Sequence, residues 1–101
     1  MLFGISFPDS VEAIEDGAFD ECKGLEVLVF PDHLKRIGNS VFDSCAALTD
    51  VFFPEGLEEI GGRAFDKCKC LKQVTLSEAT VIAYDSFPYF VEIERTIHSA
   101  A

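Results

Sequence analysis

The chain has 101 residues, about the length of one domain, with 18 acidic against 8 basic side chains and a formal net charge of −10 at pH 7. Binding to nucleic acid or to anionic lipid rests on lysine and arginine, so this balance argues against both and favours a basic partner or simply high solubility. No stretch approaches the ~20 apolar residues that a membrane helix needs. Residues 1–8 contain no basic residue, so they make a poor secretory signal and allow a cytoplasmic location.

Four sets of identical side chains return along the chain every 23 residues. The sets are isoleucine (Ile14, Ile37 and Ile60), phenylalanine (Phe19, Phe42 and Phe65), cysteine (Cys22, Cys45 and Cys68) and leucine (Leu25, Leu48 and Leu71). Ile82 and Phe87 continue the first two sets after a step of 22 residues. Self-similarity at a period of about 20 to 50 residues is typical of a solenoid, in which each repeat buries its apolar side against its neighbours.

These sets divide the chain into repeats with no linker between them. A half repeat at 2–13 precedes full repeats at 14–36, 37–59 and 60–81. A degenerate C-terminal cap follows at 82–98, where Phe90 replaces the cysteine. Residues 1–101 are therefore predicted to form one repeat domain.

The second half of each repeat predicts a β-strand. In the first full repeat Leu28 and Phe30 alternate with Val27 and Val29, so the two pairs point to opposite faces of a sheet. Pro31 then ends the strand, because proline cannot donate a ladder hydrogen bond. Stacked repeats place such strands side by side in a parallel sheet.

The first half of each repeat predicts a short helical turn. Ala18, Phe19 and Cys22 fall at positions i, i+1 and i+4, which suits about one turn of helix with Phe19 and Cys22 facing inward. Crossover connections between parallel strands are right-handed in almost all proteins. The sequence thus predicts an α/β repeat fold, a right-handed solenoid whose phenylalanines form a continuous spine.

The four cysteines allow two interpretations. An even number of cysteines in a short chain is compatible with disulfides. However, Cys22, Cys45 and Cys68 occupy one equivalent position, which favours small buried thiols in the reduced form. Cys70 lies outside this set, at a position held by glycine or alanine in the other repeats, and is expected to be the exposed thiol.

One phrase carries a resemblance to a known family. Ile-Gly-x-x-(Ala/Val)-Phe-x-x-Cys-x-x-Leu-x-x-Val-x-(Phe/Leu)-Pro occurs at 37–54 and nearly again at 60–77, where Ser77 replaces proline; Glu15 replaces the glycine in the first repeat. This phrase resembles the BspA-type (treponemal) leucine-rich repeat. The resemblance implies a leucine-rich-repeat solenoid with its parallel sheet on the concave side and short helical turns on the convex side. It also implies protein recognition or adhesion without catalysis, at the cell surface or in secreted form.

The outward positions of the strands are the candidate partner-binding residues of the concave face: Val27, Val29, Asp50, Phe52, Gln73 and Thr75. Val27, Val29 and Phe52, continued by Pro31 and Pro54, predict an apolar patch, and such patches with aromatic anchors often mark interaction sites. Alternatively, β-propensity or shielding within a short solenoid accounts for these residues.

An acidic set lies just beyond the strands and comprises Asp9, Asp32, Glu55 and Glu78. A cation or a basic partner would relieve repulsion between stacked carboxylates, but acidic residues are common in turns and no calcium-loop motif is present. Neither the pair Cys68 and Cys70 nor the two histidines, His33 and His98, complete a zinc or nucleophile motif. The sequence therefore predicts no metal, no cofactor and no catalytic site.

Two functions remain open. The first is a non-enzymatic module that binds a protein partner through the concave strand face. The alternative is a structural solenoid that associates end to end into homo-oligomers, because the N-terminal half repeat begins in a strand and leaves Leu2, Ile5 and Phe7 without a cap. The aromatic, off-pattern stretch at 84–97 is expected to close the other end.

Overall fold

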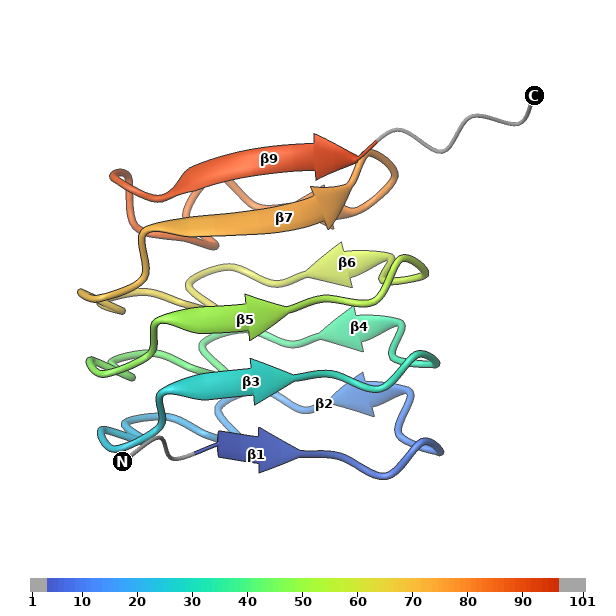
Figure 1. Ribbon diagram of the computed structural model, residues 1–101, viewed down its shortest axis with the longest axis horizontal. Helices are drawn as coiled ribbons and strands as arrows, with labels where there is room; N and C mark the ends of the chain where they lie inside the picture. The colour runs from blue at the N-terminus through green and yellow to red at the C-terminus, as the bar shows by residue number, and fades with distance from the viewer. Residues whose placement is uncertain (1–3, 97–101) are drawn as a thin grey trace.

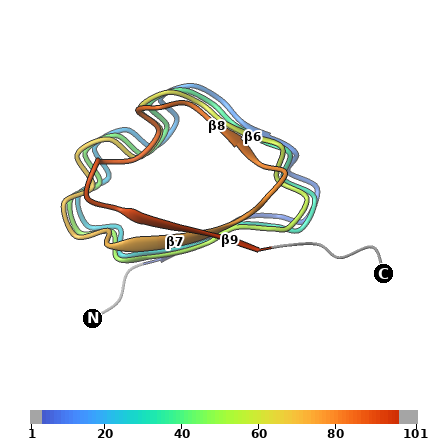
Figure 2. The ribbon, with the colours of Figure 1, turned by 90° about the horizontal axis from the view of Figure 1, so that it is seen from above.

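The computed structural model describes residues 4–96; Leu2 and His98 lie outside this range. Parallel strands follow one another in successive turns of a solenoid (Figure 1), and the turns superimpose when seen along the axis (Figure 2). The front side, which faces the viewer in Figure 1, carries β1 (Gly4–Ser6), β3 (Val27–Val29), β5 (Asp50–Phe52), β7 (Gln73–Ser77) and β9 (Glu92–Thr96). The back sheet comprises β2 (Ala13–Ile14), β4 (Arg36–Ile37), β6 (Glu59–Ile60) and β8 (Val81–Ile82).

Equivalent residues of successive repeats lie directly beside one another. The paired residues include Ile5, Leu28 and Val51 on the front side, and Ile14, Ile37 and Ile60 on the back. The third repeat has one residue fewer, and the chain is shorter before β8, so Ile60 still pairs with Ile82 after a step of 22 residues. The parallel solenoid predicted from the 23-residue period is therefore confirmed.

Proline sets the length of the front strands. β3 and β5 have three residues each and end one residue before Phe30-Pro31 and Phe53-Pro54 turn the chain inward. In the third repeat Ser77 stands in place of proline and β7 runs for five residues, all of which pair with β9. Beyond Ser77, Glu78 N donates to Thr96 O at 2.9 Å, so this ladder runs past the position at which proline follows the other front strands.

The front side is interrupted between β5 and β7. β1, β3 and β5 form one ladder and β7 and β9 form another, and no backbone hydrogen bond joins β5 to β7 in the described part of the chain. The back sheet is continuous from β2 through β4 and β6 to β8. The second and third repeats therefore separate on the front side only.

The predicted helical turns on the convex side are wrong, since residues 4–96 contain no helix. In the segments that follow β2 and β4, every second N–H donates to a carbonyl of the next turn. In the first repeat these bonds run from Gly17, Phe19 and Glu21 to Asn39, Val41 and Asp43, at 3.0, 3.0 and 2.8 Å. Positive φ angles at Gly17 (68°) and Glu21 (59°) also break any run of right-handed helix. Bonds between turns thus take the donors that a helix would use within one turn.

The predicted phenylalanine spine is confirmed. The rings of Phe19, Phe42, Phe65 and Phe87 stack face to face, with centroid distances of 5.4, 5.2 and 5.1 Å and interplanar angles of 5°, 15° and 5°. Phe42 and Phe65 in the middle of the stack are fully buried. Each ring therefore packs on the ring of the next turn.

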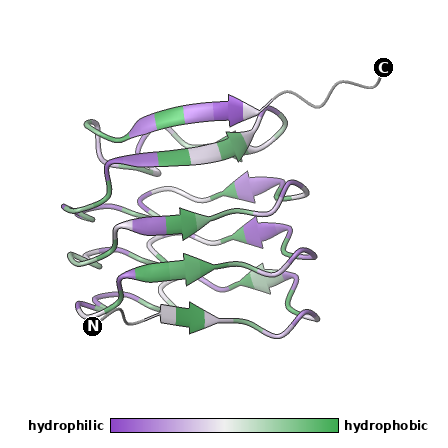
Figure 3. Cartoon of the chain, in the orientation of Figure 1, coloured by the Kyte–Doolittle hydropathy of each residue, from purple (hydrophilic) through white to green (hydrophobic). Residues whose placement is uncertain are grey.

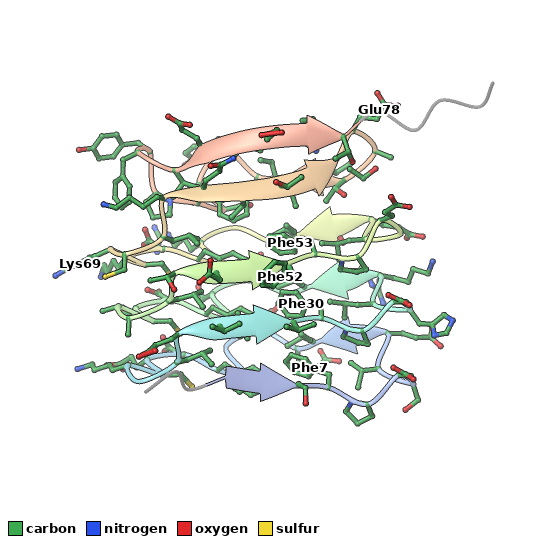
Figure 4. The ribbon with its side chains drawn as sticks, viewed as in Figure 1. Phe7, Phe30, Phe52, Phe53, Lys69 and Glu78 are labelled. Carbon is green, nitrogen blue, oxygen red and sulfur yellow. The ribbon has the colours of Figure 1, made fainter. Side chains whose placement is uncertain are left out.

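A second aromatic row, Phe7, Phe30 and Phe53, runs beside the spine (Figure 4). Its rings stack on one another at 5.6 and 5.5 Å. They meet the spine at steep angles, with Phe30 against Phe42 at 62° and Phe53 against Phe65 at 85°. Edge-to-face pairs add about 0.5–1.5 kcal/mol to what burial alone gives, so the two rows brace each other.

The cysteines are free thiols. Cys45 and Cys68 are buried and donate to the carbonyls of Phe19 and Phe42 at 3.5 and 3.2 Å. Burial removes water from the thiolate and raises the pKa of Cys45 to about 11 and that of Cys68 to about 12, so both stay protonated and unreactive at neutral pH. The expectation of buried reduced thiols is confirmed for these two residues and met only in part by Cys22, which is half-buried.

Glycine follows the isoleucine where a preceding turn crowds that position. Asn39 accepts a hydrogen bond from Gly62 N at 2.8 Å, which brings its side chain against the next turn. A Cβ on Gly61 would lie 2.5 Å from Asn39 Oδ1 and 2.7 Å from the carbonyl oxygen of Gly38. Glu15 belongs to the first turn that the structure describes, and no side chain among residues 4–96 crowds it in this way.

The C-terminal cap departs from the expected alignment. Val91 N donates to Pro88 O at 3.1 Å, as Leu71 N donates to Cys68 O. Pro88 therefore takes the place of the cysteine, and the prediction that Phe90 does so is wrong: Phe90 is 42% exposed. Fewer residues separate Phe87 of the spine from β9 in this turn. Residues equivalent to those of the third repeat therefore come earlier in the sequence than a 22- or 23-residue step would place them.

Arg95 ties the last strand to the turn below it. Its Nη1 donates to the carbonyl oxygens of Ser77 at 2.8 Å and Thr80 at 2.7 Å. Charge-assisted bonds of this kind are stronger than neutral ones. Arg95 thus supplies donors to two carbonyls at the end of the third repeat.

We predict that Phe42→Ala lowers the free energy of unfolding by about 3–5 kcal/mol, because it removes a fully buried ring from the middle of the stack. Tyr84→Ala is the matched control, since this ring is fully exposed and its loss should change stability by less than about 0.5 kcal/mol. Urea unfolding followed by circular dichroism measures both. Equal effects of the two substitutions would contradict the spine as the source of stability.

Candidate functional site

The candidate residues of the front face fall into two groups. β3 and β5 place Val27 beside Asp50, and Val29 beside Phe52, in one ladder. Gln73 and Thr75 lie on β7, across the interruption, and pair instead with Glu92 and Glu94 of β9. The Gln73 side chain donates to Glu94 at 3.3 Å. The structure therefore brings four of the six predicted residues together and sets the other two on the far side of a gap.

Val29 and Phe52 form the apolar centre of this face. Their side chains are 50% and 57% exposed, although they stand in strands whose alternate residues are buried. They are direct neighbours in the ladder, and Val27 beside them is half-buried. Figure 3 shows β3 in the hydrophobic colour and β5 in that colour beyond its first residue, and Figure 4 shows Phe52 on β5. We name Val27, Val29 and Phe52 the front patch.

The prolines do not enlarge the front patch. The prediction that Pro31 and Pro54 continue it is wrong, since both are buried. Each proline carbonyl accepts a bond from the residue three positions later, Leu34 or Leu57, at 3.2 Å. This tight turn carries the chain away from the front face, and the prolines pack inward with it.

A groove of about 550 Å³ opens where β5 and β7 fail to pair. Phe52, Phe53 and Pro54 contribute to one wall, and Gln73, Thr75 and Ser77 to the other. Phe53 is half-buried, whereas Phe30 at the equivalent position in the closed part of the sheet is only 5% exposed. The sequence interpretation missed this groove. Its only sequence signal is Ser77 in place of proline, which marks the repeat where the front ladder changes partner.

The acidic set, Asp9, Asp32, Glu55 and Glu78, is exposed in the turns beyond the front strands. Glu78 is seen at this edge, beside the end of β7 (Figure 4). His33 lies in the same row of turns, with Nδ1 3.2 Å from the carbonyl oxygen of Asp9. Among residues 4–96, no three histidine, cysteine or acidic side chains come close enough together to hold a metal ion.

Cys70 is exposed and follows Lys69, which projects from the turn at the opposite edge of the front side (Figure 4). It is thus the accessible thiol in the described part of the chain that lies outside the cysteine set. Residues 4–96 also include no helix with the length and apolar character to cross a membrane.

Three aromatic residues near the C-terminal end are exposed, which the sequence interpretation did not predict. Tyr84 and Tyr89 are 100% and 99% exposed, and Phe90 packs edge-on against Tyr89 at 5.5 Å. The stretch at 84–97 was expected to close this end of the solenoid; within it Phe87 and Val91 turn inward, whereas the two tyrosines do not. The tyrosines occupy no position of the 23-residue pattern, which is the signal that could have shown their exposure.

Comparison with known proteins agrees with this architecture. The family model described as "BspA type Leucine rich repeat region (6 copies)" matches residues 2–99. A search of curated protein sequences finds no match. Two solved structures are similar to the chain, with TM-scores of 0.78 and 0.77.

The first of these structures is a leucine rich cell surface protein from Faecalibacterium prausnitzii A2-165, with 33% identity over 83% of this chain. The second is the T. pallidum Leucine Rich Repeat protein, with 26% identity over 94% of this chain. The chain spans 22% and 52% of the length of these two proteins. Because the family model covers nearly the whole sequence, the chain belongs to the BspA-type leucine-rich-repeat family.

Proposed function

We propose that the chain is a non-enzymatic module that binds a protein partner through its front face. The observation that carries this proposal is the exposure of Val29 and Phe52 side by side on β3 and β5. Exposing half of each side chain forgoes the free energy of burying it, about 25 cal/mol for each Å² of apolar surface. A partner that covers the front patch recovers this free energy, and aromatic side chains such as Phe52 are frequent anchors of protein interfaces.

The repeat architecture supports the same function. Leucine-rich repeats and other solenoids present extended surfaces, built from equivalent positions of successive turns, and commonly serve in protein interaction. In this chain the front strands supply these positions: their outward residues differ in polarity from repeat to repeat, whereas the inward ones, such as Ile5, Leu28 and Val51, are all aliphatic. A variable outer face on an apolar interior is what a recognition surface on a fixed scaffold requires.

A cell-surface location is part of this proposal. The similar protein from Faecalibacterium prausnitzii is described as a leucine rich cell surface protein, and BspA-type membership points the same way. A net charge of −10 favours basic partners over nucleic acid or anionic lipid. The acidic set along the edge of the front side would add to that preference.

Selection from a displayed peptide library tests the front patch. Peptides selected on the natural chain should bind the Phe52→Asp variant about 2 kcal/mol less favourably, or with roughly thirtyfold lower affinity, because a charge then occupies the anchor position. Val81→Asp is the matched control: Val81 is 64% exposed on the back sheet, so the same change there should leave affinity unaltered. Circular dichroism should be the same for all three proteins. Binders that tolerate Phe52→Asp and are lost with Val81→Asp would place the site on the other side.

A second role, end-to-end association, is supported by the open first turn. β1 and β2 stand at the ends of their ladders within residues 4–96, and Ile5, Phe7 and Val11 are only partly buried there. Free strand edges over an uncovered core favour pairing with another chain. We expect light scattering after size exclusion, in reductant, to give a mass that rises with concentration above 11.1 kDa. A constant monomer mass would rule this role out, and a larger species lost on reduction would implicate Cys70.

A further inference from the structure

The opening between β5 and β7 leaves several backbone groups of both strands without a backbone partner among residues 4–96. Asp50 N donates to Glu26 O at 3.2 Å, and Phe52 O accepts from Phe30 N at 3.2 Å, so these groups of β5 point to β3. Residues alternate along a parallel strand, so the N–H and C=O of Val51 and the N–H of Phe53 point the other way, toward β7. No backbone bond to these groups is present in residues 4–96.

β7, which faces β5 across the opening, also has backbone groups that form no bond to β5. Glu92 N donates to Lys72 O at 2.9 Å, so the groups of Lys72 point to β9. By the same alternation, the N–H and C=O groups of Gln73 and Thr75 point toward β5. Backbone donors and acceptors are strong groups that are almost always paired in native proteins, with protein or with water. Two strand edges that should bond to each other therefore face one another across the groove.

The opening is a wedge that widens toward the front. Behind it, Ile60 of β6 pairs with Ile82 of β8, and the rings of Phe65 and Phe87 stack at 5.1 Å. At the front, the groove of about 550 Å³ lies within the ~300–1,000 Å³ range of ligand sites. It runs along β5 directly beside Phe52, the exposed member of the front patch.

We propose that this opening receives an extended segment of the protein partner, which takes up the hydrogen bonds that β5 and β7 do not make to each other. This inference rests on the proposed function and names the form of the partner. A β-strand supplies alternating donors and acceptors at the spacing of Val51 and Phe53, which is the recognition mode of strand addition. Because β6 and β8 stay paired in the back sheet, the segment enters from the front. The paired back sheet acts as a hinge, and β5 and β7 move further apart to admit the segment.

The charge around the opening selects a basic segment. Asp50 and Glu55 line the β5 side, and Lys72 is the base among the lining residues. Glu94 on β9 lies one strand further, bonded to Gln73. A segment that alternates apolar and basic residues would place its apolar side chains against Phe52 and its cations near these carboxylates.

Amide hydrogen exchange read by nuclear magnetic resonance tests the inference on the intact chain. In the free protein, the amides of Val51 and Phe53 should exchange much faster than that of Leu28, which lies in the closed ladder between β3 and β5. A synthetic peptide of alternating valine and lysine, at millimolar concentration, should slow the Val51 and Phe53 amides by roughly three- to tenfold. The same peptide with N-methylated amides has lost its donors and should give no such protection.

Charge reversal supplies the second arm. Asp50→Lys should weaken the peptide's effect, whereas Glu59→Lys, an equivalent charge reversal on the exposed face of the back sheet, should not. Val51 and Phe53 amides as protected as Leu28 in the free chain would overturn the inference, because the strands would then be paired in solution. So would protection that is absent at millimolar peptide or unchanged by N-methylation. Peptide-induced shifts at Val29 and Phe52 without amide protection would overturn strand pairing alone and leave the front patch as the binding site.

Discussion

Each turn of the solenoid is held to the next by backbone hydrogen bonds that require equivalent residues to lie one above the other. The bonds occur in the front ladder, in the back ladder and in the segment between them, where Phe19 N reaches Val41 O. A residue bonded in this way in one turn needs an equivalent residue beside it in the next turn. A single 23-residue period therefore sets the register of all three regions. The phenylalanine stack is a consequence of that register, because rings at one position are brought to about 5 Å from each other.

The same constraint explains where the surface is free to change. Side chains inside the solenoid contact their equivalents above and below, so Ile, Phe, Cys and Leu recur without variation. Outward side chains contact only their neighbours on one face, and Val29 can stand beside Phe52 while Ser6 stands below both. The opening between β5 and β7 lies where the back strands of two successive turns, β6 and β8, are paired and the front strands are not. Candidate binding features therefore gather on the front side, around Phe52.

Much of this architecture could be predicted from the sequence, because the period reports the register directly. The strand at Val27–Val29, its buried partner Leu28 and the stacked phenylalanines all follow from spacing and alternation. The helical turns could not be excluded in this way. Ala18, Phe19 and Cys22 have helical spacing, and only the three-dimensional structure shows that Phe19 N is taken by the next turn. Local patterns describe one turn, whereas the decisive bonds lie between turns.

The candidate site was predictable in part for the same reason. Alternation identified Val29 and Phe52 as outward residues, and both are exposed. The inward packing of Pro31 and Pro54 depends on the path of the turn that follows each strand, which residue type alone does not give. The groove beside Phe53 depends on how β5 and β7 lie relative to one another, which no pattern within one repeat describes. Features that depend on a single residue, such as an outward side chain, could be predicted from the sequence. Features that depend on how two turns lie relative to each other could not.

The full repeats share one register, and each turn is bonded only to its neighbours; deletion of one repeat tests this most directly. A chain without residues 37–59 brings Arg36 to Ile60, and the lost turn is replaced by the next one in the same register. A chain without residues 37–48 instead joins a back strand to a front strand. Thermal unfolding by circular dichroism should show a cooperative transition, at a lower midpoint, for the first deletion and none for the second. Loss of folding in both chains, or an unchanged transition in both, would contradict the equivalence of the turns.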